Sequence, residues 1–350
     1  MLSHFFSDQL IQWQHQYGRK GLPWQGYQSP YLTWVSEIML QQTQVDNAKP
    51  YFIRFIKHYP NVQTLAEANP EDVMRDWAGL GYYARARNLH LSAKIIHQQH
   101  NNQFPNSIEE LIKLPGIGRS TAGAILAFGF KQRGVILDGN VKRVLSRFFG
   151  IFNNPHYQRG NHFYWQVSHL VTPTIDCDVY TQAIMDIGAT VCHVKTPQCQ
   201  ICPLQSKCYA EHYHCQHHLP IKKLKKKPKT LKKLFILPVK SGKVGLTRQH
   251  TSNIWKGLWC PIIIDTTTSV FDFSHIHYRH IIKDLKHVFT HQTWKIDCIL
   301  VYPPNDLHNQ IDAWYDIHQL DQIGLPKPMQ TIKEMIQYEK NLLHETAETT

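Results

Sequence analysis

Leu114-Pro115-Gly116-Ile117-Gly118-Arg119 joins two stretches of helical spacing, Ile108 to Leu114 and Ser120 to Phe130. Proline stops the first helix, and the two glycines let the backbone come close to a ligand. Amide groups at the start of the second helix point outward together and favour an anion. The stretch therefore predicts two helices around a phosphate-binding turn at about residues 108–130, with a plain turn between packed helices as the alternative.

The turn lies in a part of the chain whose spacing is helical almost throughout. The other helical stretches are Phe5 to Tyr17, Tyr31 to Val45, Tyr51 to His58 and Val141 to Phe149. Strand-like spacing follows at Leu234 to Val239, Val244 to Thr247 and Trp294 to Tyr302, with a last helix near Thr331 to Leu343. We predict an all-α domain at 1–215, a basic linker at 216–233, a smaller α/β domain at 234–344 and a disordered tail at 345–350.

Charge and composition narrow the class of partner. The 350 residues carry a net charge of +12, and eight lysines fall within residues 222–233. Such a surplus favours a polyanion, although basic balance alone is weak support. No stretch approaches the ~20 apolar residues of a membrane span, and the first residues do not resemble a signal peptide. We expect a cytoplasmic monomer with no membrane partner.

Four of the eight cysteines have the spacing of metal ligands, Cys192-x6-Cys199-x2-Cys202-x5-Cys208. Zinc and a [4Fe-4S] cluster both accept four thiolates, and the spacing does not choose between them. No open catalytic position is indicated, so the metal is expected to be architectural. The remaining cysteines, Cys177, Cys215, Cys260 and Cys298, are interpreted as ordinary packed thiols.

Two carboxyl groups stand out by their context. Glu37 would share a helical face with Gln41 and Gln44, an amide-rich surface that suggests the wall of a cleft. Asp138 begins the helix that follows Ile136-Leu137, where its simplest role is an N-cap. Each residue therefore has both a functional and a purely structural interpretation.

Several segments together resemble a known family. SEIMLQQTQV at 36–45, GLGYYARARNL at 79–89, LPGIGRSTAGAI at 114–125, ILDGNVKRVL at 136–145 and the four cysteines are similar, in order and spacing, to the adenine DNA glycosylases of the helix-hairpin-helix superfamily. The resemblance implies that the cysteines hold a [4Fe-4S] cluster. It also implies excision of a flipped adenine that is mispaired with 8-oxoguanine or guanine in double-stranded DNA.

The resemblance assigns the chemistry to three residues. Glu37 would protonate adenine N7, and burial beside Trp34 or Trp24 would raise its pKa enough to keep it protonated near neutrality. Asp138 would stabilise the positive charge that develops on the sugar, and Asn140 would orient it.

The resemblance also implies DNA contacts. Gln41, Gln42 and Tyr82 match residues that wedge into the opened base stack, and Gln182 matches a position in the adenine pocket. Gly116 and Gly118 would approach a phosphate, and either Lys20 or Lys142 would trap the product sugar weakly. Ser120 stands where a related branch has an imine-forming lysine, so we expect a monofunctional enzyme.

The C-terminal part resembles, more loosely, the 8-oxoguanine-reading domain of the family, which is related to Nudix hydrolases. Trp255 to Trp259 and Phe289-Thr290-His291 match its landmarks, with threonine where serine is common. The sequence between Glu211 and Glu334 contains no glutamate, and a Nudix metal site needs several, which argues against a nucleotide pyrophosphohydrolase.

Two further hypotheses compete with the monofunctional enzyme, namely a glycosylase that also cuts the DNA backbone and a non-catalytic DNA scaffold.

Overall fold

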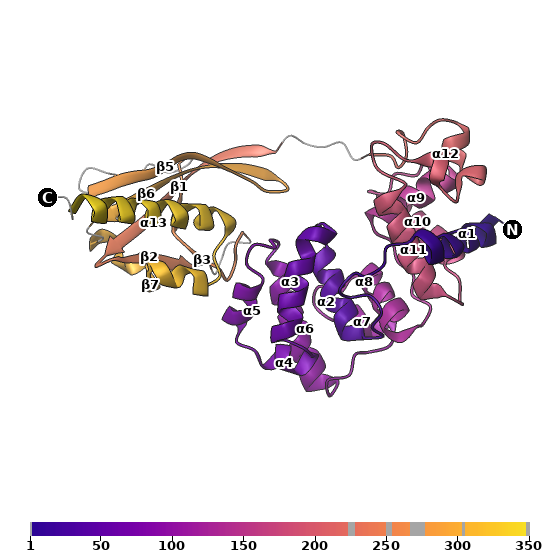
Figure 1. Cartoon of the computed structure of the whole chain (residues 1–350), viewed down its shortest axis with the longest axis horizontal. Coiled ribbons are helices and arrows are strands. Elements are labelled where there is room, and N and C mark those ends of the chain that lie inside the picture. Colours follow the sequence, from indigo (N-terminus) through magenta and orange to yellow (C-terminus); the bar gives the residue numbers. More distant parts are fainter. Residues whose placement is uncertain (1, 223–227, 250–253, 267–276, 303–304, 348–350) are drawn as a thin grey trace. The chain divides into compact units, whose positions relative to one another are not determined.

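The computed structural model describes residues 2–222, 228–249, 254–266, 277–302 and 305–347, which form two compact units (Figure 1). Unit 1 comprises residues 1–67 and 88–225, and unit 2 comprises residues 68–87 and 226–350. Unit 1 contains α1 (Leu2–Tyr17), α2 (Pro30–Leu40), α3 (Val45–His58), α4 (Val62–Glu67), most of α6 (Ala84–Gln99), α7 (Ile108–Leu111), α8 (Arg119–Ala124), α9 (Gly139–Phe149), α10 (Gln158–Val171), α11 (Cys177–Thr190) and α12 (Tyr209–His212). Unit 2 contains α5 (Pro70–Asp76), β1 (Lys229–Lys240), β2 (Lys243–Arg248), β3 (Trp259–Cys260), β4 (Ile262–Asp265), β5 (His277–Val288), β6 (Gln292–Tyr302), β7 (Ala313–Asp316) and α13 (Lys327–Ala347).

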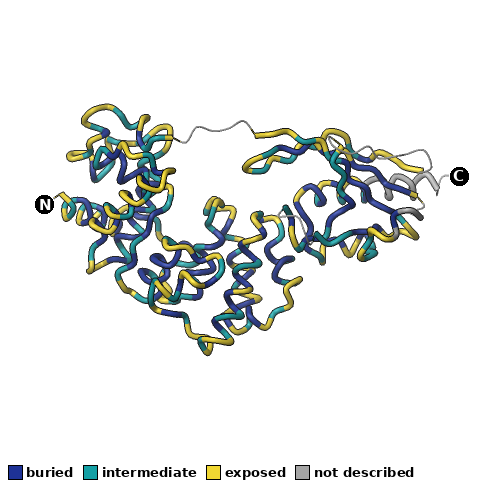
Figure 2. Tube along the Cα trace, turned by 180° about the vertical axis from the view of Figure 1, so that it is seen from behind, coloured by how far each residue is buried: buried dark blue, intermediate teal, exposed yellow. Residues whose placement is uncertain are grey.

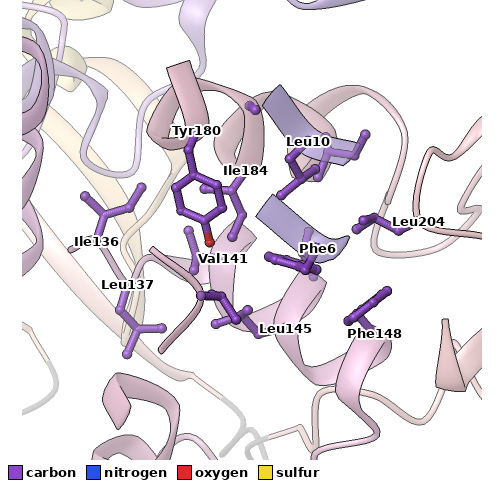
Figure 3. Close-up of a cluster of buried hydrophobic side chains, with 14 of the residues drawn as sticks. Phe6, Leu10, Ile136, Leu137, Val141, Leu145, Phe148, Tyr180, Ile184 and Leu204 are labelled. Atoms are coloured by element: carbon purple, nitrogen blue, oxygen red, sulfur yellow. The ribbon is translucent and has the colours of Figure 1, made fainter. Parts of the chain in front are cut away.

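A core between α1, α9, α10 and α11 holds one half of unit 1 together. Phe6 and Leu10 of α1 face Leu145 and Phe148 of α9 and Ile184 of α11, and all five are buried (Figure 3). Figure 2 shows that buried and exposed residues alternate along the helices of this unit. The fold therefore fixes the start of α9, which carries Asp138, against α11, which carries Gln182.

The predicted helices of unit 1 coincide with α1, α2, α3, α7, α8 and α9, although α7 ends at Leu111 rather than Leu114 and one predicted helix is broken. The predicted helix Tyr31 to Val45 is two helices, because α2 ends at Leu40 and α3 begins at Val45. Gln42 adopts a left-handed conformation (φ 58°), and the Thr43 amide bonds back to the Leu40 carbonyl. The expectation that Glu37, Gln41 and Gln44 share one helical face is therefore wrong.

The second helix of the phosphate-binding turn also departs from regularity. The predicted helix Ser120 to Phe130 is α8 followed at once by a π-helical turn, Ile125–Gly129. Gly123 explains part of the packing here, because a Cβ at Gly123 would lie 2.1 Å from the Val135 carbonyl oxygen. The segment that leads to Asp138 therefore packs directly on α8.

Unit 2 is built on a mixed sheet with the order β3-β2-β1-β6-β5, in which β4 pairs with β1 and β7 pairs with β2. β1 and β6 are parallel, and β5 and β6 form an antiparallel hairpin. One buried cluster on this sheet includes Leu234, Ile236, Ile299 and Val301. The predicted combination of a helical domain and a smaller α/β domain is confirmed.

Three boundaries differ from the sequence prediction. β1 begins at Lys229 because residues 229–233 pair with residues 292–296 of β6, so they are sheet rather than linker. α13 continues through Ala347, which shortens the predicted tail, and residues 348–350 lie outside the described residues. Residues 68–87, placed by the prediction in the first domain, group with unit 2, where the Tyr83 hydroxyl donates to the Leu325 carbonyl at 3.3 Å.

Among the helices in the described ranges, none combines the length and the apolar character that a membrane crossing requires.

Candidate active site

α2 positions Glu37 at the wall of a cavity in unit 1. The Ser29 side chain caps this helix by accepting a hydrogen bond from the Leu32 amide at 3.2 Å. The helix is buried along most of its surface, and Glu37 is its acidic residue. Glu37 lines a cavity of about 550 Å³ together with Trp24 and Gln182. The cavity is large enough to hold a drug-sized or nucleobase-sized ligand.

The environment of Glu37 favours its protonated form. Burial raises the pKa of the Glu37 carboxyl group from 4.5 to about 7, and the negative charge of Asp138 acts in the same direction. Trp24 lines the cavity beside Glu37, whereas Trp34 packs against Tyr31 and Phe104 and is not part of the cavity wall. Glu37 is therefore poised to donate a proton near neutral pH.

Asp138 is both the N-cap of α9 and the charged neighbour of Glu37. Its carboxylate accepts a hydrogen bond from the Val141 amide at 2.7 Å. Burial is the largest effect and raises the pKa of Asp138 above its ordinary value, while the backbone N–H groups of Val141 and Asn140 and the charges of Arg143 and Lys142 offset part of the rise. The structural and functional interpretations of Asp138 are thus compatible, because the groups that cap the helix also stabilise the ionised carboxylate.

The side chain of Asn140 has another partner. Its carbonyl oxygen accepts a hydrogen bond from the Arg143 guanidinium at 2.9 Å, and the same guanidinium donates to the carbonyl oxygens of Gly188 and Cys192. Asn140 therefore faces Asp138 through its backbone N–H, and its side chain ties the start of α9 to Arg143. Burial lowers the pKa of Lys142, and the charge of the nearby Asp138 opposes part of this shift.

Asp186 was not found from the sequence, although it organises one side of the cavity. It is fully buried and accepts hydrogen bonds from Gln14 at 3.1 Å and Gln182 at 2.8 Å, and it forms an ion pair with Arg19 at 2.7 Å. Gln14, Arg19 and Gln182 all line the cavity. An acid within the apolar stretch Ala183 to Gly188 was the available signal.

The turn between α7 and α8 contains both glycines of the predicted phosphate-binding motif. Gly116 is left-handed (φ 82°), and a Cβ there would lie 2.9 Å from Asn88 Cβ. Gly118 is the N-cap of α8, and open space surrounds the position of its absent Cβ. The Ser120 hydroxyl accepts a hydrogen bond from the Leu137 amide at 3.0 Å, next to Asp138. Ser120 therefore supports the backbone that carries the carboxylate.

Gln41 and Gln42 lie in the turn that follows α2. Gln41 is the C-cap of that helix, and its amide nitrogen donates to the Thr121 hydroxyl at 3.5 Å. Gln41 is partly buried, whereas Gln42 is exposed and left-handed. These glutamines stand at the surface of unit 1 beyond the end of the helix that carries Glu37.

Unit 2 brings Tyr82 and Thr290 together. Tyr82 is left-handed (φ 49°) and 46% exposed, and its hydroxyl lies 3.2 Å from the Thr290 hydroxyl. Thr290 and His291 form the tip of the β5–β6 hairpin, which closes with a hydrogen bond from the Phe289 amide to the Gln292 carbonyl. Phe289 itself packs on Trp255, His287 and Trp294, so aromatic rings support the tip from behind.

The four predicted ligand cysteines lie close together in unit 1. Cys192, Cys199, Cys202 and Cys208 line one small cavity, and the Arg147 guanidinium donates to the Cys192 sulfur at 3.3 Å. Among the described residues, no group of three or more His, Cys, Asp or Glu side chains has the arrangement of a site for a single metal ion. Four converging thiols beside a buried cation fit the donor set of an anionic iron-sulfur cluster.

A helix-hairpin-helix fold with Glu37 on the wall of a cavity that can hold a base, and with Asp138 close enough to raise the pKa of Glu37, is typical of one class of protein, the base excision glycosylases. Comparison agrees: residues 35–167 match the HhH-GPD superfamily of base excision DNA repair proteins, and residues 234–335 match the NUDIX domain. A solved thermostable thymine-DNA glycosylase superposes with a TM-score of 0.56 at 21% identity, covering 61% of this chain and 97% of that chain, and so shares its fold.

Two relatives that align over nearly the whole chain indicate which kind of base excision glycosylase it is. The adenine DNA glycosylase of Buchnera aphidicola subsp. Baizongia pistaciae (strain Bp) is 40% identical over 95% of this chain and 97% of its own length. That of Buchnera aphidicola subsp. Schizaphis graminum (strain Sg) is 38% identical over 96% and 99%. The chain belongs to the adenine DNA glycosylases, DNA N-glycosylases of base excision repair.

Proposed function

We propose that this chain hydrolyses the N-glycosidic bond of adenine mispaired with 8-oxoguanine or guanine, and that it leaves the DNA backbone intact. The observation that carries the proposal is Glu37, a carboxyl group with a pKa of about 7 on the wall of a base-sized cavity and within electrostatic reach of Asp138. Two coupled carboxyl groups in opposite protonation states are what the cleavage of a glycosidic bond requires.

In the proposed reaction Glu37 transfers its proton to adenine N7 while the bond from the sugar C1′ to adenine N9 breaks. The bonding electrons leave with the base, and Asp138 stabilises the positive charge on the sugar. A water molecule then adds its oxygen to C1′ and loses a proton, which gives free adenine and an abasic sugar. Gln182, held by Asp186, is proposed to contact the flipped base.

Ser120 supports the monofunctional mode. A lyase needs an amine that attacks the sugar, whereas Ser120 uses its hydroxyl to accept a hydrogen bond from the Leu137 amide. Strand cleavage without added base would contradict this part of the proposal.

Tyr82 and Thr290 support reading of the opposite base by unit 2. Their hydroxyl groups are 3.2 Å apart, and Thr290 is exposed at a hairpin tip, where it could meet a nucleotide. The threonine keeps the hydroxyl group of the serine that is common in this family.

We infer that Cys192, Cys199, Cys202 and Cys208 hold a [4Fe-4S] cluster. The cluster would supply no step of the hydrolysis and would fix the loop between α11 and α12. Iron and acid-labile sulfide analysis of the purified protein tests the assignment. About four irons and four sulfides per chain are expected, and stoichiometric zinc without sulfide would contradict it.

Single-turnover excision from a duplex with adenine opposite 8-oxoguanine tests the activity. Glu37→Gln and Asp138→Asn are each expected to lower the rate by a factor on the order of 10² to 10⁴. A matched acid-to-amide change at Asp178, an ion-paired residue on the same cavity, should leave the rate near that of the unmodified protein. Equal rates in all four proteins would refute the assigned roles.

A further inference from the structure

Three lysines stand side by side across the sheet of unit 2. In the strand register, Lys232 of β1 is opposite Lys295 of β6, and Lys295 is opposite Lys286 of β5. Residues directly opposite each other point to the same face of a sheet, and all three lysines are exposed. Neighbouring strands are about 4.8 Å apart, so the lysine row is about 10 Å wide.

The lysine row is an electrostatic cost to the folded protein. Like charges directly opposite each other destabilise a sheet. In the described part of the chain, an ion-pair partner is found for Lys295, whose nitrogen lies 3.6 Å from the exposed Asp284 carboxylate. By contrast, the neighbouring Lys233 is paired with Asp265 at 2.6 Å and is mostly buried. Lys232 and Lys286 thus present their charges to a ligand from outside.

The charges of neighbouring residues determine on which side of the lysine row the positive potential is strongest. Asp284 and Asp297 lie on the inner side of the row and are joined by a hydrogen bond from the Asp284 amide to the Asp297 carboxylate. On the outer side, the next residues of the same face are Thr230, Thr293 and Val288, which carry no charge. The positive potential is therefore strongest toward the tip of the β5–β6 hairpin.

The same hairpin tip carries Thr290. Lys286 is four residues from Thr290, about 13 Å along a strand at ~3.3 Å per residue. Double-stranded DNA rises ~3.4 Å per base pair, so 13 Å spans about four base pairs and several phosphate groups. A duplex that brings a base to Thr290 must then carry phosphates past the lysine row.

We propose that Lys232, Lys286 and Lys295 form a phosphate-binding surface for the duplex whose base is read at the β5–β6 hairpin tip. The proposal rests on the proposed function for the identity of the duplex. The lysine row contributes affinity without sequence or damage preference, because phosphate contacts carry no information about the bases.

The salt dependence of DNA binding tests this surface in the full-length protein. Each phosphate contact steepens the slope of log affinity against log salt concentration by about 0.9. The double variant Lys232→Gln/Lys286→Gln should therefore lose about 1.8 from the slope on an undamaged duplex. It should also bind the undamaged and mispaired duplexes more weakly by the same factor, measured on a Glu37→Gln background that keeps the mispair intact.

The chain offers a matched control. Lys240 and Lys243 are also exposed and in register, but they lie at the other end of β1. Lys240→Gln/Lys243→Gln removes the same charge and should keep the original slope. Two results for the slope of log affinity against log salt concentration would overturn the inference: an equal loss in both double variants, or no loss in Lys232→Gln/Lys286→Gln. Weaker binding of the mispaired duplex alone by Lys232→Gln/Lys286→Gln would overturn it as well. Melting temperature should stay equal or rise, since a repulsion is removed. Absence of adenine excision by the unmodified protein would instead sink the proposed function and leave the slope result standing.

Discussion

At the scale of single residues, the proposed activity depends on the shift of one pKa, that of Glu37. An exposed glutamic acid is ionised at neutral pH and cannot donate a proton. Glu37 lies at the wall of a cavity beside another acid, and both effects oppose its ionisation. The difference between a helix-surface glutamate and a general acid is thus decided by its surroundings rather than by its local sequence.

The pH dependence of excision follows from this shift. In the proposed reaction the protonated form of Glu37 is the proton donor, so the single-turnover rate should fall as pH rises above about 7, approaching tenfold per pH unit. A flat rate between pH 7 and about 9 would contradict this role.

Folding stability should depend on the protonation of Glu37 in the same direction as the excision rate. The folded pKa of Glu37 is raised above its ordinary value, so its contribution is fully present below about pH 4.5 and is lost as pH rises toward about 7. The melting temperature of Glu37→Gln should therefore fall less than that of the unmodified protein between about pH 4.5 and about pH 7.

Asp186 is expected to be essential for the cavity wall. Asp186→Asn breaks a buried ion pair with Arg19, and we expect a loss of about 2–4 kcal/mol in the free energy of unfolding, near the low end because Arg19 is part exposed. Urea denaturation measures the loss. Asp178→Asn is the control, because its pair with Lys131 is more exposed and should contribute less than about 1 kcal/mol.

Thr290 is predicted to affect selectivity rather than stability. Thr290→Val removes the hydroxyl that pairs with Tyr82 at an exposed position, so the melting temperature should change little. The ratio of excision rates opposite 8-oxoguanine and opposite guanine should fall, whereas Thr290→Ser should preserve it. An unchanged ratio in Thr290→Val would argue against base reading at this position.

At the scale of elements, substitutions at the two glycines between α7 and α8 should have different effects, on stability at Gly116 and on the proposed DNA binding at Gly118. Gly116→Ala forces a left-handed alanine against Asn88 and should cost about 1–3 kcal/mol in unfolding free energy. Gly118→Ala has an ordinary backbone conformation and open space, so its stability should stay within about 0.5 kcal/mol. If this turn approaches a phosphate, Gly118→Ala will still weaken DNA binding, which fluorescence anisotropy can measure.

At the scale of the whole molecule, the two units should respond separately to loss of the cluster. The cysteine loop packs on α9 through Arg147, whose guanidinium donates to the Cys192 sulfur and the His193 carbonyl. Cys202→Ser should therefore raise hydrogen exchange in residues 139–149 and 192–219 of unit 1. Exchange in the sheet of unit 2 should not change, and a uniform increase over both units would contradict this independence.

The sequence predicted α1, α2, α3, α7, α8, α9 and α13, and the strands β1, β2 and β6, because their apolar residues repeat at the period of the element. It gave no bounds for the long helices α6, α10 and α11 or for β5. It could not predict the break at Gln41 to Gln44, since a left-handed glutamine has no clear local signal. The start of β1 at Lys229 was missed for a related reason. A lysine-rich segment lacks strand propensity, but pairing with β6 supplies the hydrogen bonds that place it in the sheet.

What the sequence determined by itself was the order of motifs: the glycine turn, the ligand-spaced cysteines, and the two acids in their family-like segments. Each depends on spacing along one chain, and spacing is fully present in the sequence. Tertiary structure decided what depends on distance between remote segments. It brought Asp138 close enough to raise the pKa of Glu37, buried Asp186 beneath Gln182, and aligned Lys232, Lys286 and Lys295 across three strands. Electrostatic and hydrogen-bond energies fall steeply with distance in space, and the number of residues between two groups does not determine that distance.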